Sequence, residues 1–172
     1  MKESIQIFLT GKRRWRKLDI LVELTELKNN RLLRDESEVE KFEKSIENIL
    51  ELEDVNHIEI LCQGFDDLTE NDEVMFGLIH AIESYDKIVG SEVSLEVLAN
   101  SIPKMLPHAK EWLKILHKRI LNHEPSRNIY KKIISTLNND IQEYVVSQLT
   151  SIKEKNPSRF EESVNSILEF LK

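Results

Sequence analysis

Residues 64–85 read GFDDLTENDEVMFGLIHAIESY, an acidic loop that leads into an amphipathic helix. Thr69, with Asp72 three positions later, is a start signal for that helix. Its apolar side chains recur at the spacing of one helical face: Val74, Met75, Leu78, Ile79 and Ile82. Gly64 is a plausible stop for a preceding segment that begins at Asp54. The stretch from Asp54 to Tyr85 therefore predicts two short helices joined by an acidic turn.

The same helical spacing recurs along the rest of the chain and predicts roughly nine short helices. A chain of 172 residues is long enough for a hydrophobic core, and we expect a single all-helical domain over residues 1–172. Short helices joined by tight turns are typical of an irregular bundle or of HEAT-like stacked helical pairs. The proportions of the pair over residues 54–85 favour stacked pairs, although the sequence shows no clean repeat period.

Local signals predict where several helices begin and end. Ser37 followed by Glu40 has the spacing of a capping box. Residues 86–94 contain Gly90 and two serines, which indicates a turn, and Pro103 indicates the end of a short helix. Pro107 suits the first turn of a helix over residues 107–122.

The net charge of −7 is distributed unevenly. Residues 35–100 contain nineteen acidic and three basic side chains, a net charge of −16, whereas residues 1–34 and 101–172 carry +5 and +4. Such an acidic block repels nucleic acid and attracts basic proteins. The alternatives are a solvated surface that keeps the protein soluble, and internal neutralisation by the flanking basic segments.

The motifs of common enzymes and cofactor sites are missing from the sequence. The four glycines are too widely spaced for a phosphate-binding loop, and the lone Cys62 lies in an apolar run that predicts a core residue. His80 and Glu83 have the spacing of one helical metal-ligand pair, but a single pair favours a helix-packing histidine. We expect no enzyme activity, no cofactor, no metal and no small-molecule partner.

The N-terminal segment is the basis for two expectations, one about the cellular compartment and one about nucleic-acid binding. Its apolar run over residues 5–9 is too short for a signal peptide or a membrane span, so we expect a cytoplasmic protein with no membrane partner. Residues 12–17 place five cationic side chains around Trp15, a composition that suits nucleic-acid binding. The alternatives are that Trp15 anchors the segment on the core and that the basic run pairs with the acidic middle.

Three segments carry a resemblance to a known family: GFDDLTENDEVMFGLIHAIE at 64–83, LPHAKEW at 106–112 and RILN at 119–122. Together they resemble the immunity protein 30 family of bacterial polymorphic-toxin systems, over about residues 40–135. The resemblance implies a small, cytoplasmic, all-helical protein. It further implies an antitoxin role, in which the chain neutralises a toxin domain, often one encoded beside it, by direct binding.

The function expected from this resemblance is the binding of a basic toxin, possibly a nuclease, through an acidic surface. The other functions kept open are a helical-repeat scaffold or adaptor, and a nucleic-acid-binding regulator that uses residues 12–17. The expected contact residues are Asp66, Asp67, Glu70, Asp72, Glu73, Trp112, His108 and Arg119. Core packing is the alternative for Trp112, and an internal ion pair with Glu83 or Glu111 is the alternative for Arg119.

Overall fold

The computed structural model describes residues 20–172, whose regular secondary structure is entirely helical. Residues 20–30 are helical. They are followed by α2 (Glu36–Leu50), the 3-10 helix η1 (Val55–His57), α3 (Ile58–Cys62), α4 (Asp72–Ser84), α5 (Asp86–Val89), α6 (Ser91–Met105), α7 (Lys110–Asn122), α8 (Glu124–Thr136), α9 (Asn139–Lys155) and α10 (Pro157–Leu168). The prediction of an all-α fold is confirmed. The segments at 5–9 and 12–17 lie outside the described residues.

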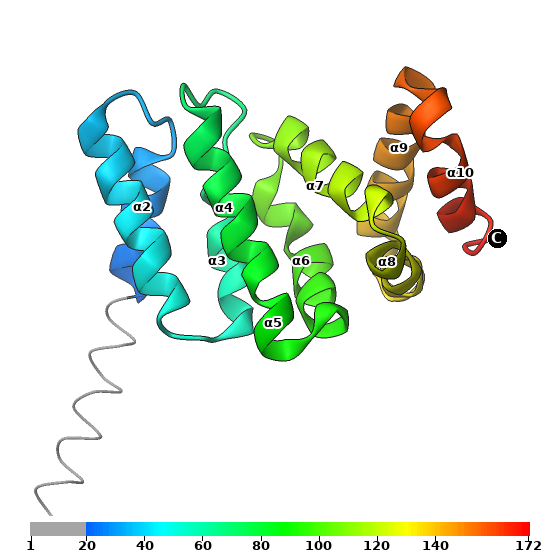
Figure 1. The fold of residues 1–172 in the computed structure, drawn as a ribbon, viewed down its shortest axis with the longest axis horizontal. Helices are drawn as coiled ribbons and strands as arrows, with labels where there is room; N and C mark the ends of the chain where they lie inside the picture. The colour runs from blue at the N-terminus through cyan, green and yellow to red at the C-terminus, as the bar shows by residue number, and fades with distance from the viewer. Residues whose placement is uncertain (1–19) are drawn as a thin grey trace, which may run out of the picture.

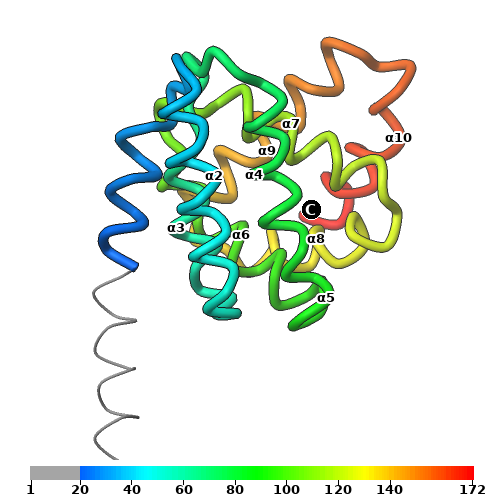
Figure 2. Tube along the Cα trace, turned by 60° about the vertical axis from the view of Figure 1, so that its left-hand side comes forward, coloured from blue at the N-terminus to red at the C-terminus, as the bar shows by residue number. Residues whose placement is uncertain are grey.

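The helices are arranged as stacked pairs in two layers (Figures 1 and 2). One layer contains α2, α4, α7 and α9, in which α2 packs against α4 and α7 packs against α9. The other layer contains α3, α6, α8 and α10, each of which packs against the next. Consecutive helices such as α6 and α7 contribute one member to each layer. Of the two expected architectures, the structure has the stacked pairs.

The buried apolar side chains form one continuous cluster from Leu27 to Ile167. Cys62 is fully buried within it, as predicted, and burial raises the pKa of its thiol. Full burial of one leucine, isoleucine, valine, phenylalanine or methionine side chain of this cluster contributes about 1.5–3 kcal/mol to folding. Of the predicted apolar face of α4, Met75, Leu78, Ile79 and Ile82 are buried in this cluster and Val74 is partly buried, and Ala81 joins them. Within residues 20–172, no helix has the length and hydropathy needed to cross a bilayer.

Two helix starts differ from the sequence prediction. The N-cap of α2 is Asp35, whose carboxylate accepts the backbone N–H of Glu38 at 2.9 Å, so the predicted Ser37 cap is wrong by two positions. A carboxylate at Asp35 offers a charged acceptor before Ser37 is reached. Likewise α7 begins at Lys110 and not at residue 107. The carboxylate of Asp67, which precedes Glu111 by 44 positions, accepts backbone N–H groups of the first turn there.

The region around α6 also corrects the prediction. Residues 86–89 form the short helix α5, and α6 starts directly after Gly90, so most of the predicted turn is helical. Gly90 has φ 85°, a left-handed conformation that glycine adopts without strain. Pro103 lies inside α6, which continues to Met105. The missing N–H of Pro103 removes one helical hydrogen bond, and the burial of Ile102 and Met105 outweighs that loss.

Candidate functional site

The acidic loop, residues 65–71 between α3 and α4, is fixed to the first helical segment. Asp66 is only 6 % exposed, and its Oδ2 accepts from Nε of Arg31 at 2.9 Å. Its Oδ1 accepts the backbone N–H of Leu68 at 3.0 Å. The backbone N–H of Glu70 donates to the carbonyl oxygen of Leu32 at 2.8 Å. The carboxylate of Asp66 therefore serves to hold the loop in place.

The other side of the loop is fixed to the start of α7. The carboxylate of Asp67 accepts the backbone N–H groups of Glu111 at 3.1 Å and of Trp112 at 3.3 Å. In return the N–H of Asp67 donates to the carbonyl oxygen of His108 at 2.8 Å. A carboxylate at this position satisfies N–H groups that have no partner inside α7 and complements the helix dipole. Asp67 therefore acts as a cap supplied from a distant part of the chain.

Trp112 is buried behind the loop and is 5 % exposed. Its ring is stacked on Phe65 with centroids 6.0 Å apart and meets the edge of Phe76 at 5.4 Å. Its indole N–H donates to the carbonyl oxygen of Asp66 at 3.1 Å. Core packing, the alternative for Trp112, is what the structure shows. The same indole links the loop to α4 and α7.

His108 is half-buried beneath the loop. Desolvation and the nearby Arg31 lower the pKa of His108, so its neutral form is favoured. Its Nε2 is buried and has no hydrogen-bond partner among residues 20–172. In the isolated chain this side chain supports the loop and offers little surface to a partner.

The remaining acidic residues, Glu70, Asp72 and Glu73, are exposed, and the same stretch of chain contains two exposed apolar side chains. Asp72 and Glu73 lie in the first turn of α4, where the helix dipole favours negative charge. Leu68 is 77 % exposed and Phe76 is 38 % exposed. We call this group the α4 patch: Glu70, Asp72, Glu73, Leu68 and Phe76. Sequence reasoning missed the two apolar members, although Phe76 departs from the apolar face of α4.

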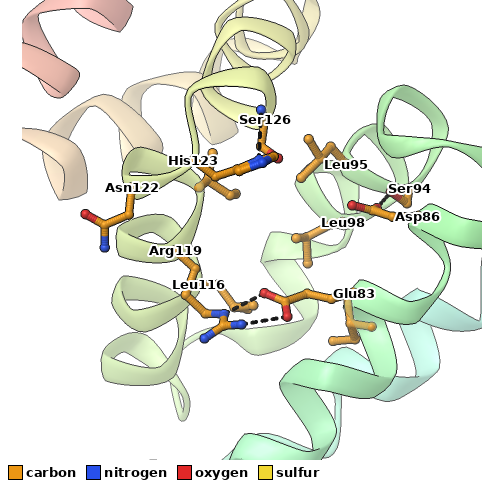
Figure 3. A pocket seen from close by; sticks show the side chains of 12 residues that line it. Glu83, Asp86, Ser94, Leu95, Leu98, Leu116, Arg119, Asn122, His123 and Ser126 are labelled. Carbon is orange, nitrogen blue, oxygen red and sulfur yellow. Dashed lines mark hydrogen bonds and ion pairs between the residues drawn. The ribbon is translucent and has the colours of Figure 1, made fainter.

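A groove of about 430 Å³ begins farther along α4 and separates it from α7 and α8 (Figure 3). Apolar side chains of α6 and α7 line much of it, among them Leu95, Leu98 and Leu116. Arg119 and Glu83 approach each other in the groove, as the dashed lines in Figure 3 show. Arg119 Nε lies 2.5 Å from Glu83 Oε1, and Nη2 lies 2.7 Å from Oε2. The internal ion pair considered for Arg119 is thus present, with Glu83 as the partner.

Asp86 is a second carboxylate in the groove. It accepts hydrogen bonds from the hydroxyl groups of Ser94 and of Ser91, the latter at 3.1 Å. No ion pair of Asp86 is present within residues 20–172, and its side-chain hydrogen-bond donors there are the two serine hydroxyl groups. Opposite it, Nδ1 of His123 contacts the hydroxyl of Ser126 at 2.8 Å. The groove therefore combines apolar side chains with an unneutralised carboxylate.

The spacing of His80 and Glu83 does not create a metal site. Across residues 20–172 no group of three or more His, Cys, Asp or Glu side chains is arranged to hold a metal ion. Glu83 is engaged by Arg119, and His80 is exposed. The prediction that His80 packs between helices is wrong, because residue 80 lies on the outward face of α4.

The family model for immunity protein 30 matches residues 29–130, which is more than half of the chain. The chain belongs to the immunity protein 30 family. The matched region contains the acidic loop, the α4 patch, the groove and α7, whereas α9 and α10 lie beyond it. No curated protein and no solved structure matches the chain. An immunity protein has, in general, a toxin as its partner.

Proposed function

We propose that this immunity protein 30 chain neutralises a cognate toxin domain by binding it directly through the α4 patch. The observation that carries the proposal is the exposure of Glu70, Asp72 and Glu73 beside the apolar Leu68 and Phe76. None of the three carboxylates has an ion-pair partner in the part of the chain that the structure describes. Their charge is therefore available to a basic partner, and the two apolar side chains supply area that water leaves on binding.

Charge complementarity accounts for the association of this surface with a toxin. Many nucleases present a basic surface to their substrate, and an acidic protein surface competes for the same region. Complementary charge raises the association rate, whereas the desolvated apolar centre slows dissociation. A nuclease toxin is therefore the class that the acidic surface fits, and occlusion of its active site is the proposed mechanism.

The expected contact residues divide into two groups on geometry. Glu70, Asp72 and Glu73 are proposed as direct contacts, and Arg119 as a contact at the edge of the groove. The other four act in this proposal by holding the loop and the start of α7 in position: Asp66, Asp67, His108 and Trp112. The proposed protein is a non-enzymatic, cytoplasmic antitoxin that works as one domain in a polymorphic toxin system.

The test begins with the recovery of the toxin. The tagged protein is purified from its host cells, and proteins that remain after a salt wash are identified by mass spectrometry. One toxin domain bound in a 1:1 complex is the expected result. Recovery of nucleic acid or of housekeeping complexes alone would instead favour the regulator or the scaffold function.

The second step uses charge reversal on the recovered toxin domain. The triple variant Glu70→Lys, Asp72→Lys and Glu73→Lys should slow association by about 10-fold or more at low salt and abolish protection of cells that express the toxin. Two of these positions are in the first turn of α4, so thermal unfolding is measured in parallel. The matched control reverses three exposed acidic residues of the last helical segment: Glu161, Glu162 and Glu169. Unchanged protection by the α4 triple variant would refute the site.

A further inference from the structure

A basic pocket lies on the other side of α7 from the groove. It is a cavity of about 200 Å³ between α7, α9 and the start of α10. Its basic side chains are Lys114, Lys118, Lys155 and Arg159. They come from three helices that are distant in sequence, so the stack, and not a local run of charge, brings them together.

Most of this positive charge is not neutralised within the pocket. Glu111 is the single carboxylate of the lining, and its Oε1 is engaged by Nζ of Lys114 at 2.5 Å. Within residues 20–172, Lys118, Lys155 and Arg159 form no ion pair. Lys118 and Lys155 also act on Glu111, because they help Lys114 to lower the pKa of that carboxyl. The pocket therefore has a local excess of about three positive charges, counting each Lys and Arg as fully protonated.

The pocket lining also contains neutral hydrogen-bond donors and the start of helix α10. Asn122, Ser151 and Asn156 contribute amide and hydroxyl groups to the lining. Asn156 is also the N-cap position of α10, yet its side chain makes no capping hydrogen bond to the helix. The first turn of α10 thus forms part of the pocket wall, through Asn156, Arg159 and Phe160.

We propose that the basic pocket binds the terminal phosphate or pyrophosphate group of a small molecule. A phosphate monoester carries about −1.5 to −2 charges at neutral pH and three acceptor oxygens. It therefore matches the charge of a pocket lined by three cations that are unpaired within residues 20–172 better than a ligand with a single carboxylate would. Lysine and arginine are the usual partners of such groups. The cavity is too small for a folded domain and is open enough for a phosphate with part of the group that bears it.

This inference is independent of toxin binding. The α4 patch is acidic and recognises a basic partner, whereas the basic pocket attracts an anion and lies on α7, α9 and α10. It also departs from the expectation that the chain has no small-molecule partner, which rested on the absence of a glycine-rich phosphate loop. Side chains from separate helices replace the backbone N–H groups that such a loop supplies.

The experiment is isothermal titration of the full chain with pyrophosphate, with ATP and with citrate, at an ionic strength of about 50 mM so that screening is modest. Saturable 1:1 binding of pyrophosphate, with ATP competing for the same site, is the expected result. The triple variant Lys118→Gln, Lys155→Gln and Arg159→Gln should weaken this binding by about 10-fold or more. Its circular dichroism spectrum and melting temperature establish that it is folded.

The matched control removes the same charge elsewhere. Lys28, Lys87 and Lys132 are exposed, and the variant Lys28→Gln, Lys87→Gln and Lys132→Gln should bind pyrophosphate as the unmodified chain does. The proposal is overturned if pyrophosphate does not bind, if the control loses binding equally, or if citrate binds as tightly as pyrophosphate. A single-stranded oligonucleotide that needs the same three residues but is not displaced by pyrophosphate would also overturn it, in favour of a nucleic-acid surface.

Discussion

Arg119 of α7 and Glu83 of α4 form a two-point ion pair, with Nε–Oε1 and Nη2–Oε2 distances of 2.5 and 2.7 Å. Seven positions earlier on both helices, Trp112 meets the edge of Phe76. The equal spacing shows that α4 and α7 run parallel, as equivalent helices of successive stacked pairs do. The polar contact lies in the groove and the aromatic contact lies behind the α4 patch, so one helix pair positions both features.

The ion pair should matter more for binding than for stability. Both side chains are about two-fifths exposed, and exposed pairs contribute roughly 0–1 kcal/mol. We expect Glu83→Gln, Arg119→Gln and the double variant each to change the free energy of unfolding by less than about 1 kcal/mol in urea titrations. The same three variants form a double-mutant cycle for toxin affinity. A destabilisation of several kcal/mol would show that the pair is a structural element of the groove.

Asp67 should stabilise α7 from outside the helix. Asp67→Ala removes the acceptor of two backbone N–H groups, and loss of a capping side chain costs about 0.5–2 kcal/mol. Asp67→Asn keeps an acceptor oxygen and should cost less. The urea midpoint measures both variants, with Glu162→Ala as the control at an exposed acidic position outside the first turn of a helix. Equal midpoints for Asp67→Ala and Glu162→Ala would contradict the capping role.

Phe76 and Trp112 should separate binding from folding. Trp112→Ala removes a buried ring that contacts Phe65 and Phe76, and such a truncation costs about 3–5 kcal/mol. Phe76 is 38 % exposed, so Phe76→Ser should cost clearly less in stability but weaken toxin binding by about 10-fold or more. Thermal unfolding and surface plasmon resonance give the two readouts. Normal toxin binding by Phe76→Ser would show that Phe76 is not part of the toxin-binding surface.

His117 should make the protein less stable in mild acid. Its Nε2 contacts the hydroxyl of Tyr130 at 2.8 Å and its Nδ1 contacts Oε1 of Gln148. Burial lowers the pKa of His117 to about 4, against about 6.5 in an unfolded chain. The unfolded state therefore takes up a proton as the pH falls below about 6.5 while the folded state does not, so stability falls, by about 2 kcal/mol between pH 7 and pH 5.

The variant His117→Gln tests this linkage, because glutamine does not titrate and retains polar groups for Tyr130 and Gln148. Its free energy of unfolding should depend less steeply on pH between 7 and 5 than that of the unmodified chain. His80→Gln is the matched control, since His80 is exposed on α4, and it should leave the slope unchanged. An unchanged slope in His117→Gln would assign the acid sensitivity to another group.

Helix positions and core faces were largely predictable because they depend on neighbours three and four residues apart. Met75, Leu78 and Ile82 are buried on one face of α4 as their spacing indicates. The continuation of α6 past Pro103 and the start of α7 at Lys110 could not be predicted from such local spacing. Packing of Ile102 and Met105 overrides the local effect of Pro103, and the cap of α7 comes from residue 67.

The sequence by itself determined that this is an all-helical chain of the immunity protein 30 family with an acidic middle, because periodicity, charge and motifs are properties of the linear order. Only the tertiary structure decided which carboxylates are free to meet a partner. Asp66, Asp67 and Asp72 are chemically identical, but stacking of the helical pairs brings Arg31 to the first and the N–H groups of α7 to the second. The Asp72 carboxylate has no such partner within residues 20–172, and that difference arises from contacts between residues that are far apart in the chain.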